Sequence, residues 1–140
     1  MKMLLIIASL LIGHTALAQE TAPPAKPGKI IVYRTGTIIG AAGSCPVRHK
    51  NVEVMELGRG KFAEWQVAPG RYILTNKLSS IEVNVAPGEI RYVRCQIKMG
   101  FLGDGGAHLQ IVERESFEAV QDDLERKEIL TTTGDGPSTE

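Results

Sequence analysis

Two cysteines and two histidines outside the first 18 residues are the side chains whose spacing could indicate a metal or redox site. They are Cys45, His49, Cys95 and His108. Structural zinc sites pair their ligands as C-x2-4-C and H-x3-5-H, and neither spacing occurs here. In an oxidising compartment two cysteines most simply pair. We therefore expect a Cys45–Cys95 disulfide and no cofactor or metal, with two separate buried thiols as the alternative.

An enzyme that uses one of the histidines is the alternative to a binding role. His49 or His108 could serve a small hydrolase or a metal-dependent enzyme. However, His108 alternates with the apolar Leu109, which is typical of a solvent-facing strand position. A cysteine on an apolar strand face is usually inert as a nucleophile. The sequence therefore favours a protein without a catalytic site.

A stripe of polar side chains along one predicted strand is the best candidate for binding. It consists of Tyr92, Arg94, Gln96 and Lys98. One aromatic ring with two cations and an amide could stack on a sugar ring and bond hydroxyl or anionic groups. Alternatively, a C-terminal helix covers this face, and its acids pair with Arg94 and Lys98. The acids in question are Glu118, Asp122 and Glu125.

Two glycine-bearing segments, 36–44 and 100–106, connect predicted strands. The second lacks the Lys-Ser/Thr ending of a phosphate loop, and no helix follows it. Both segments carry apolar residues at their tips, namely Ile38, Ile39, Phe101 and Leu102. These residues are expected either to contact a partner or a membrane surface, or to fold back onto the core.

Short strands separated by turns are the elements that must position these side chains. The tetrapeptide Val-Ala-Pro-Gly occurs twice, at 67–70 and 85–88. Proline and glycine at its last two positions are typical of a type II turn. Seven antiparallel strands are predicted, at 29–34, 52–57, 61–67, 72–75, 80–86, 90–99 and 107–112, with a hairpin turn at 58–60. This spacing predicts a mainly β fold, a single β-sandwich-like domain.

In the longest predicted strand, alternate residues form an apolar face that should look into the core. These residues are Val93, Cys95, Ile97 and Met99. After the last strand the apolar spacing changes to that of a helix. Phe117, Val120 and Leu124 follow Ser116, a potential N-cap, at i, i+3 and i+7. One amphipathic helix from about Phe117 to Lys127 is therefore expected, laid on the sheets or across an edge.

The first 18 residues have the features of a cleavable signal peptide. Lys2 precedes an apolar run from Met3 to Ile12, and Ala16 and Ala18 give the small-x-small cleavage pattern. An uncleaved anchor is the alternative, but a span needs about 20 apolar residues. Cleavage before Gln19 would leave a proline-rich leader (19–28), the β-sandwich domain (29–130) and a disordered tail (131–140). The location is then periplasmic or secreted, with no membrane span after signal removal.

Charge is divided along the chain. Residues 19–113 contain 12 basic and 8 acidic side chains, a net charge of +4, whereas residues 114–140 contain 3 and 8, a net charge of −5. One interpretation is a basic strand domain that attracts anionic envelope polymers or lipid head groups. The other is that the acidic helix packs against the basic sheet. Nucleic acid is not an expected partner, because no basic run is interleaved with aromatic residues.

The order of the turn and strand motifs resembles a known family. The motifs are Ile31-Val32-Tyr33-Arg34, the two Val-Ala-Pro-Gly turns, Tyr92-Val93-Arg94, Lys98-Met99-Gly100-Phe101 and Leu109-Gln110-Ile111-Val112. Together they resemble the bacterial exported family called domain of unknown function 2846, over about residues 29–124. The resemblance implies a small envelope protein with a β-sandwich-like domain and no established activity. The chain differs in lacking a lipidation cysteine, in having Arg48-His49-Lys50 in place of an Asp-Gly turn, and in its short 76–79 link.

These observations together predict a non-catalytic periplasmic or secreted module that binds or braces something in the cell envelope. The expected partner is an envelope protein, a glycan or an anionic polymer. The candidate binding residues are Tyr92, Arg94, Gln96, Lys98, Phe101 and Leu102.

Overall fold

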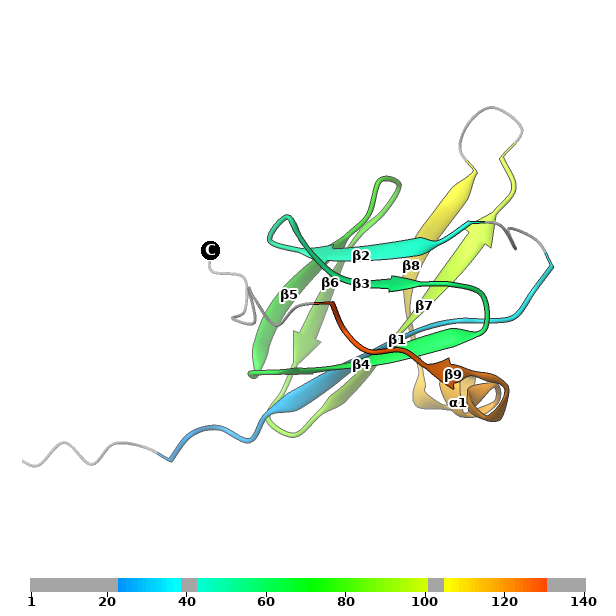
Figure 1. Ribbon diagram of the computed structural model, residues 1–140. Helices are drawn as coiled ribbons and strands as arrows, with labels where there is room; N and C mark the ends of the chain where they lie inside the picture. The colour runs from blue at the N-terminus through cyan, green and yellow to red at the C-terminus, as the bar shows by residue number, and fades with distance from the viewer. Residues whose placement is uncertain (1–22, 39–42, 101–104, 131–140) are drawn as a thin grey trace, which may run out of the picture.

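A computed structural model describes residues 23–38, 43–100 and 105–130 of the chain, and these residues form two facing sheets (Figure 1). The strands are β1 (Gly28–Arg34), β2 (Cys45–His49), β3 (Val52–Leu57), β4 (Lys61–Val67), β5 (Gly70–Thr75), β6 (Ser80–Val85), β7 (Ile90–Lys98), β8 (Gly106–Val112) and β9 (Glu125–Arg126). A short helix α1 (Arg114–Glu118) and a 3-10 turn η1 (Gln121–Asp123) complete the described elements. The predicted signal peptide and tail lie outside these residues.

One sheet has five strands in the order β8-β7-β1-β4-β9, and the other has four in the order β3-β2-β5-β6. The mainly β, sandwich-like fold is thereby confirmed. The expectation of purely antiparallel strands is wrong at two places, because β1 pairs parallel with β7 and β4 pairs parallel with β9. Between β1 and β7 the chain builds β4 and all four strands of the second sheet, and β7 then lies beside β1 in the same direction. No helix in the part of the chain described here is long and apolar enough to cross a bilayer.

The main core lies between the two sheets. Alternate residues of β1 and β7 point into it, including Ile30, Val32 and Val93, and Trp65 and Tyr72 are its largest members. The intervening residues of β1, Ile31 and Tyr33, are also buried, because a second cluster covers the outer face of the five-stranded sheet. Because both faces of β1 are buried, its sequence is a continuous apolar run and does not alternate between apolar and polar residues.

The two Val-Ala-Pro-Gly segments both carry the chain from one sheet to the other. In the second copy, Gly88 has φ 72° and the Glu89 N–H donates to the Ala86 carbonyl at 3.0 Å, which confirms a turn of the predicted type. In the first copy Gly70 has φ 152° and is already the first residue of β5. The Tyr72 hydroxyl instead holds this corner by donating to the Ala68 carbonyl at 2.5 Å.

Two predictions about the neighbouring strands need correction. Residues 58–60 do not close a hairpin within one sheet, since β3 and β4 belong to different sheets. Strand β2 was not predicted, because Pro46 lies inside it. Pro46 is tolerated because the pairing of β2 with β5 extends only over Arg48 and His49, so its missing N–H breaks no bond on that side. Lys50 and Asn51, both with positive φ, then make the tight turn into β3.

The predicted helix over 117–127 is wrong in length and position. The helix α1 covers only Arg114–Glu118, its N-cap is Glu113 rather than Ser116, and η1 and β9 follow. The backbone N–H groups of Glu125 and Lys127 donate to the carbonyls of Gly60 and Phe62, so pairing with the edge of β4 replaces further helical turns. The apolar pattern nonetheless identified the right residues, because Phe117, Val120 and Leu124 all pack on the five-stranded sheet.

Candidate functional site

The disulfide between Cys45 and Cys95 is confirmed, and it links β2 in one sheet to β7 in the other. Both residues are buried in the main core. Cys95 points into the core, as predicted from its alternation with the polar residues of β7. Since the chain has only these two cysteines, neither thiol is available as a nucleophile or a metal ligand.

The two histidines that the structure describes lie in different environments. His49 is buried among aromatic rings, with ring centroids 5.5 Å from Trp65 and 5.2 Å from Tyr72, and its Nδ1 lies 3.2 Å from the Ile73 carbonyl oxygen. His108 is half-buried on β8. Within the described ranges, no group of three or more His, Cys, Asp or Glu side chains is placed to hold a metal ion. His49 therefore serves as a packed member of the core.

The predicted polar stripe on β7 is divided by the segment that follows β8. Tyr92 shares the outward face but is buried, because Phe117 of α1 lies against it with ring centroids 5.5 Å apart. Phe117 also contacts Tyr33 and Phe62 at centroid distances of 5.3 and 5.6 Å. The helix thus covers the Tyr92 end of the stripe. It leaves Arg94 and Gln96 outside the aromatic cluster.

Arg94 and Gln96 line a recess of about 200 Å³ where β1 ends beside β7. The remaining lining residues are Arg34, Thr35, Thr37, Cys95 and Ile97. We call this set the Arg94 recess. The polar lining residues are two arginines, two threonines and a glutamine, and none of the lining residues is acidic. Such a set of groups suits an anion or an anionic sugar substituent.

Arg34 lines the recess, but its guanidinium is directed toward the facing sheet, where it bonds to Leu57 of β3. Its side chain is only 2% exposed, and its guanidinium donates to the carbonyls of Gly43 and, at 3.3 Å, Leu57. Burial lowers the pKa of Arg34, and the nearby positive charge of Arg59 lowers it further. An arginine remains protonated at neutral pH despite such a shift. Arg34 therefore joins the end of β1 to Gly43 and Leu57. Its charge also adds to the positive potential near the recess.

Arg94 is the cation of the recess that is better placed to meet a ligand. Its Nη2 donates to Gln96 Oε1 at 3.4 Å, and its buried Nε has no hydrogen-bond partner among the described residues. It lies opposite Tyr33 in the parallel β1–β7 pair. Burial raises the pKa of Tyr33, while the charge of Arg94 acts in the opposite direction. Arg94 is thus a half-buried cation with a donor, its Nε–H, that no described residue accepts from.

The other predicted site residues are not gathered here. Lys98 is exposed at the end of β7, and Phe101 and Leu102 lie outside the described residues. The acids expected to pair with Arg94 and Lys98 do not do so; Glu125, for example, forms its ion pair with Lys61. The alternative in which the acidic segment neutralises the stripe is therefore wrong in its charge pairing. It is right only in the burial of Tyr92.

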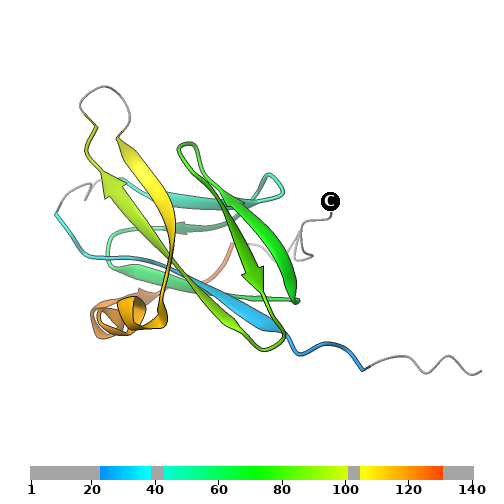
Figure 2. The same cartoon turned by 180° about the vertical axis from the view of Figure 1, so that it is seen from behind.

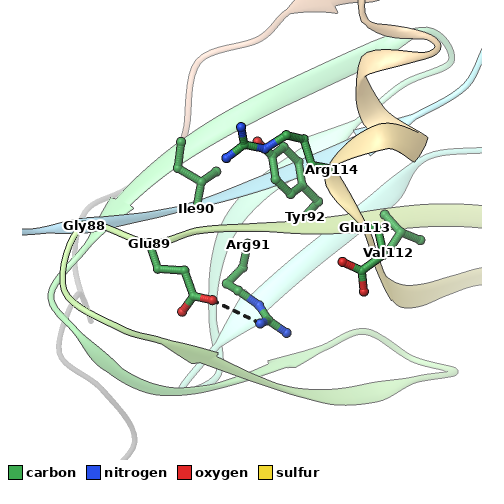
Figure 3. A pocket seen from close by; sticks show the side chains of 8 residues that line it. All are labelled: Gly88, Glu89, Ile90, Arg91, Tyr92, Val112, Glu113 and Arg114. Atoms are coloured by element: carbon green, nitrogen blue, oxygen red, sulfur yellow. Dashed lines mark hydrogen bonds and ion pairs between the residues drawn. The ribbon is translucent and has the colours of Figure 1, made fainter.

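A second surface hollow, of about 360 Å³, lies at the opposite end of β7 (Figure 3). Its lining runs from Gly88 to Tyr92 and from Val112 to Arg114. Here the charges are compensated, because Arg91 and Glu89 form an ion pair at 3.2 Å. The other two charged lining residues, Glu113 and Arg114, are of opposite sign. This hollow therefore lacks the single sign of charge that distinguishes the Arg94 recess.

Three residues of the recess were missed at the sequence level: Arg34, Thr35 and Thr37. They follow the first strand directly, and only the parallel pairing of β1 with β7 brings them beside Arg94 and Gln96. Residues in an extended link after a strand carry no periodic signal. The one available clue was that an arginine ended an otherwise apolar strand.

Comparison of the chain with family models, with curated proteins and with solved structures finds no match. The resemblance to domain of unknown function 2846 therefore stays a prediction.

Proposed function

We propose that this protein is a non-catalytic, exported module of the bacterial cell envelope that binds an acidic glycan or a similar anionic polymer. The observation that carries the proposal is the Arg94 recess, which combines two arginines with hydroxyl and amide groups and no lining carboxylate. The ligand group would be a carboxylate, sulfate or phosphate substituent. Guanidinium groups recognise these anions through paired, charge-assisted hydrogen bonds.

The dimensions and rigidity of the recess support this choice of ligand. A volume of about 200 Å³ is smaller than the 300–1,000 Å³ of typical drug-sized pockets, so it suits one anionic substituent of a longer chain rather than a whole cofactor. Cys95 is part of the lining and is bonded to β2. Arg34 is fixed by two backbone carbonyls. A site held in this way loses little conformational entropy on binding.

The export part of the proposal rests on the signal-like first residues and on the disulfide, because disulfides persist in oxidising compartments. Intact-mass measurement of protein secreted or released from the periplasm should give a chain that begins at Gln19. A chain that keeps residues 1–18 and remains in the membrane fraction would contradict this assignment.

Calorimetric titration with tetragalacturonate, a short carboxylated glycan, tests the binding part. The wild-type protein should bind tetragalacturonate and should not bind an uncharged dextran oligomer. Arg94→Gln should weaken binding at least about tenfold, the scale of one lost charge-assisted bond. Arg114→Gln, in the compensated hollow, is the matched control and should leave binding unchanged. Equal losses in both variants, or none in either, would overturn the assignment of the recess.

A further inference from the structure

Exposed apolar side chains are concentrated at one end of the sandwich. Among the described residues, five large apolar side chains are exposed, and three of them, Ile38, Leu78 and Met99, follow or connect strands at the end where β1 and β7 finish. Ile38 is 84% exposed and Met99 is 81% exposed. Side chains with so little contact to their own chain contribute almost nothing to the stability of the fold.

Three structural links place these residues at a common end. Thr37, the neighbour of Ile38, lines the Arg94 recess together with Ile97 of β7. Lys98, the neighbour of Met99, pairs with Gly106 of β8. Gly106 in turn lies so close to Leu78 that an added Cβ would be 2.5 Å from Leu78 Cδ1. Figures 1 and 2 both show the end of β7, the start of β8 and the β5–β6 turn at the same end.

The charged side chains that the structure describes in the loops at this end are basic. Lys77 in the β5–β6 turn and Lys98 at the end of β7 are both exposed. The described stretches here, 35–38, 43–44, 76–79, 96–100 and 105–107, contain no Asp or Glu. Asp123 of η1 is an acid beside these stretches, because it lines a hollow together with Thr35 and Thr37. We call the set Ile38, Lys77, Leu78, Lys98 and Met99 the loop-end surface.

We propose that the loop-end surface docks on an anionic lipid bilayer. Apolar side chains on protruding loops can enter the boundary between head groups and acyl chains, while neighbouring lysines are attracted to anionic lipid head groups. Two nearly fully exposed apolar side chains, Ile38 and Met99, two flanking cations and no carboxylate among the described loop residues match that partner. A protein interface instead needs a continuous complementary surface with a buried centre. This inference uses other residues than the Arg94 recess and does not depend on the glycan proposal.

Cosedimentation with lipid vesicles tests the inference. The mature protein should sediment with vesicles of phosphatidylglycerol and phosphatidylcholine in equal parts, and much less with phosphatidylcholine alone. The variant Ile38→Ser/Met99→Ser should bind the anionic vesicles roughly tenfold more weakly or worse, because two apolar side chains no longer leave water. Lys77→Gln/Lys98→Gln should weaken binding and reduce its salt dependence.

Two control variants make the result specific. Leu130→Ser removes another exposed apolar side chain, from the segment that bonds to β3, and should bind vesicles like the wild type. Arg114→Gln removes a cation from the hollow at the opposite end of β7 and should also bind vesicles like the wild type. Absence of wild-type binding to anionic vesicles, or equal binding by Ile38→Ser/Met99→Ser, would overturn the inference. A self-association that Ile38→Ser/Met99→Ser abolishes, without vesicle binding, would assign the surface to a second copy of the chain instead.

Discussion

The ring of Phe117 lies against the ring of Tyr92, with their centroids 5.5 Å apart, and this contact divides the outward face of β7 into two parts. On one side of it, Tyr92 becomes part of a second apolar cluster with Ile31 and Tyr33. On the other side, Arg94 and Gln96 stay outside the cluster and line the recess. The short helix α1 therefore stabilises the sheet and sets the boundary of the candidate site.

Phe117→Ala should destabilise the protein strongly, because the side chain is 3% exposed and contacts three aromatic rings. Truncating a buried phenylalanine typically lowers the free energy of unfolding by about 3–5 kcal/mol. Urea unfolding followed by Trp65 fluorescence measures this. The neighbouring Glu118→Ala, at an exposed position, should change stability by less than about 0.5 kcal/mol. A loss below about 1 kcal/mol for Phe117→Ala would show that α1 does not cover the sheet in solution.

Deleting residues 114–140 should lower the melting temperature and expose apolar surface. The deletion removes Phe117, Val120 and Leu124 from the outer face of the five-stranded sheet, and it also removes β9 from the edge of β4. Calorimetry and binding of an apolar dye such as ANS would detect both effects. Deleting residues 131–140 alone is the matched control and should leave the melting temperature unchanged. The same melting temperature for both truncations would contradict the packing described here.

Replacing both cysteines should cost stability without changing the fold. The Cys45–Cys95 bond spans a sequence separation of 50 residues, and the loop-entropy relation gives roughly 4 kcal/mol for a closure of that length. The variant Cys45→Ala/Cys95→Ala should therefore melt well below the wild type. Non-reducing peptide mapping of the wild type should show the two cysteine peptides linked. Free thiols at both positions, or equal melting temperatures, would contradict the bond.

Glu89 makes the turn after β6 sensitive to acid. Its carboxylate accepts the Ala86 N–H at 2.7 Å and pairs with Arg91, and these interactions lower the pKa of Glu89. A lowered folded-state pKa contributes stability above the unfolded value of about 4.3, and that stability is lost as pH falls through the folded pKa. Glu89→Gln should thus be slightly less stable at pH 7, by less than about 1 kcal/mol because the group is solvent-screened, and equally stable in strong acid. A difference between wild type and variant that grows as the pH falls would reverse the sign and contradict this account.

Local signals in the sequence were sufficient for much of the fold. Alternation placed Val93 and Cys95 inside, and the Pro-Gly dipeptide identified the turn at Gly88. Met99 was wrongly assigned to the inward face, because β7 ends at Lys98 and the next residue projects into solvent.

The features that could not be predicted depend on contacts between distant segments. Pro46 is compatible with a strand only because β5 leaves its edge unpaired, and the helix ends early only because β4 offers carbonyls to the backbone of residues 125–127. The recess needs the parallel pairing of β1 with β7, which no pattern within either strand specifies. The sequence therefore identified Arg94 and Gln96 as candidates but not Arg34, their neighbour in space.

Nuclear magnetic resonance of side-chain N–H groups tests the central claim, that the Arg94 recess binds anionic groups. The buried Arg94 Nε–H has no partner among the described residues, and its guanidinium contacts Gln96. Titration with tetragalacturonate should therefore shift the Arg94 Nε–H and the Gln96 amide signals together, in a saturable way, while the Arg114 Nε–H stays in place. Saturable shifts at Arg91 and Arg114 with no change at Arg94 and Gln96, or no shifts at all, would contradict the claim.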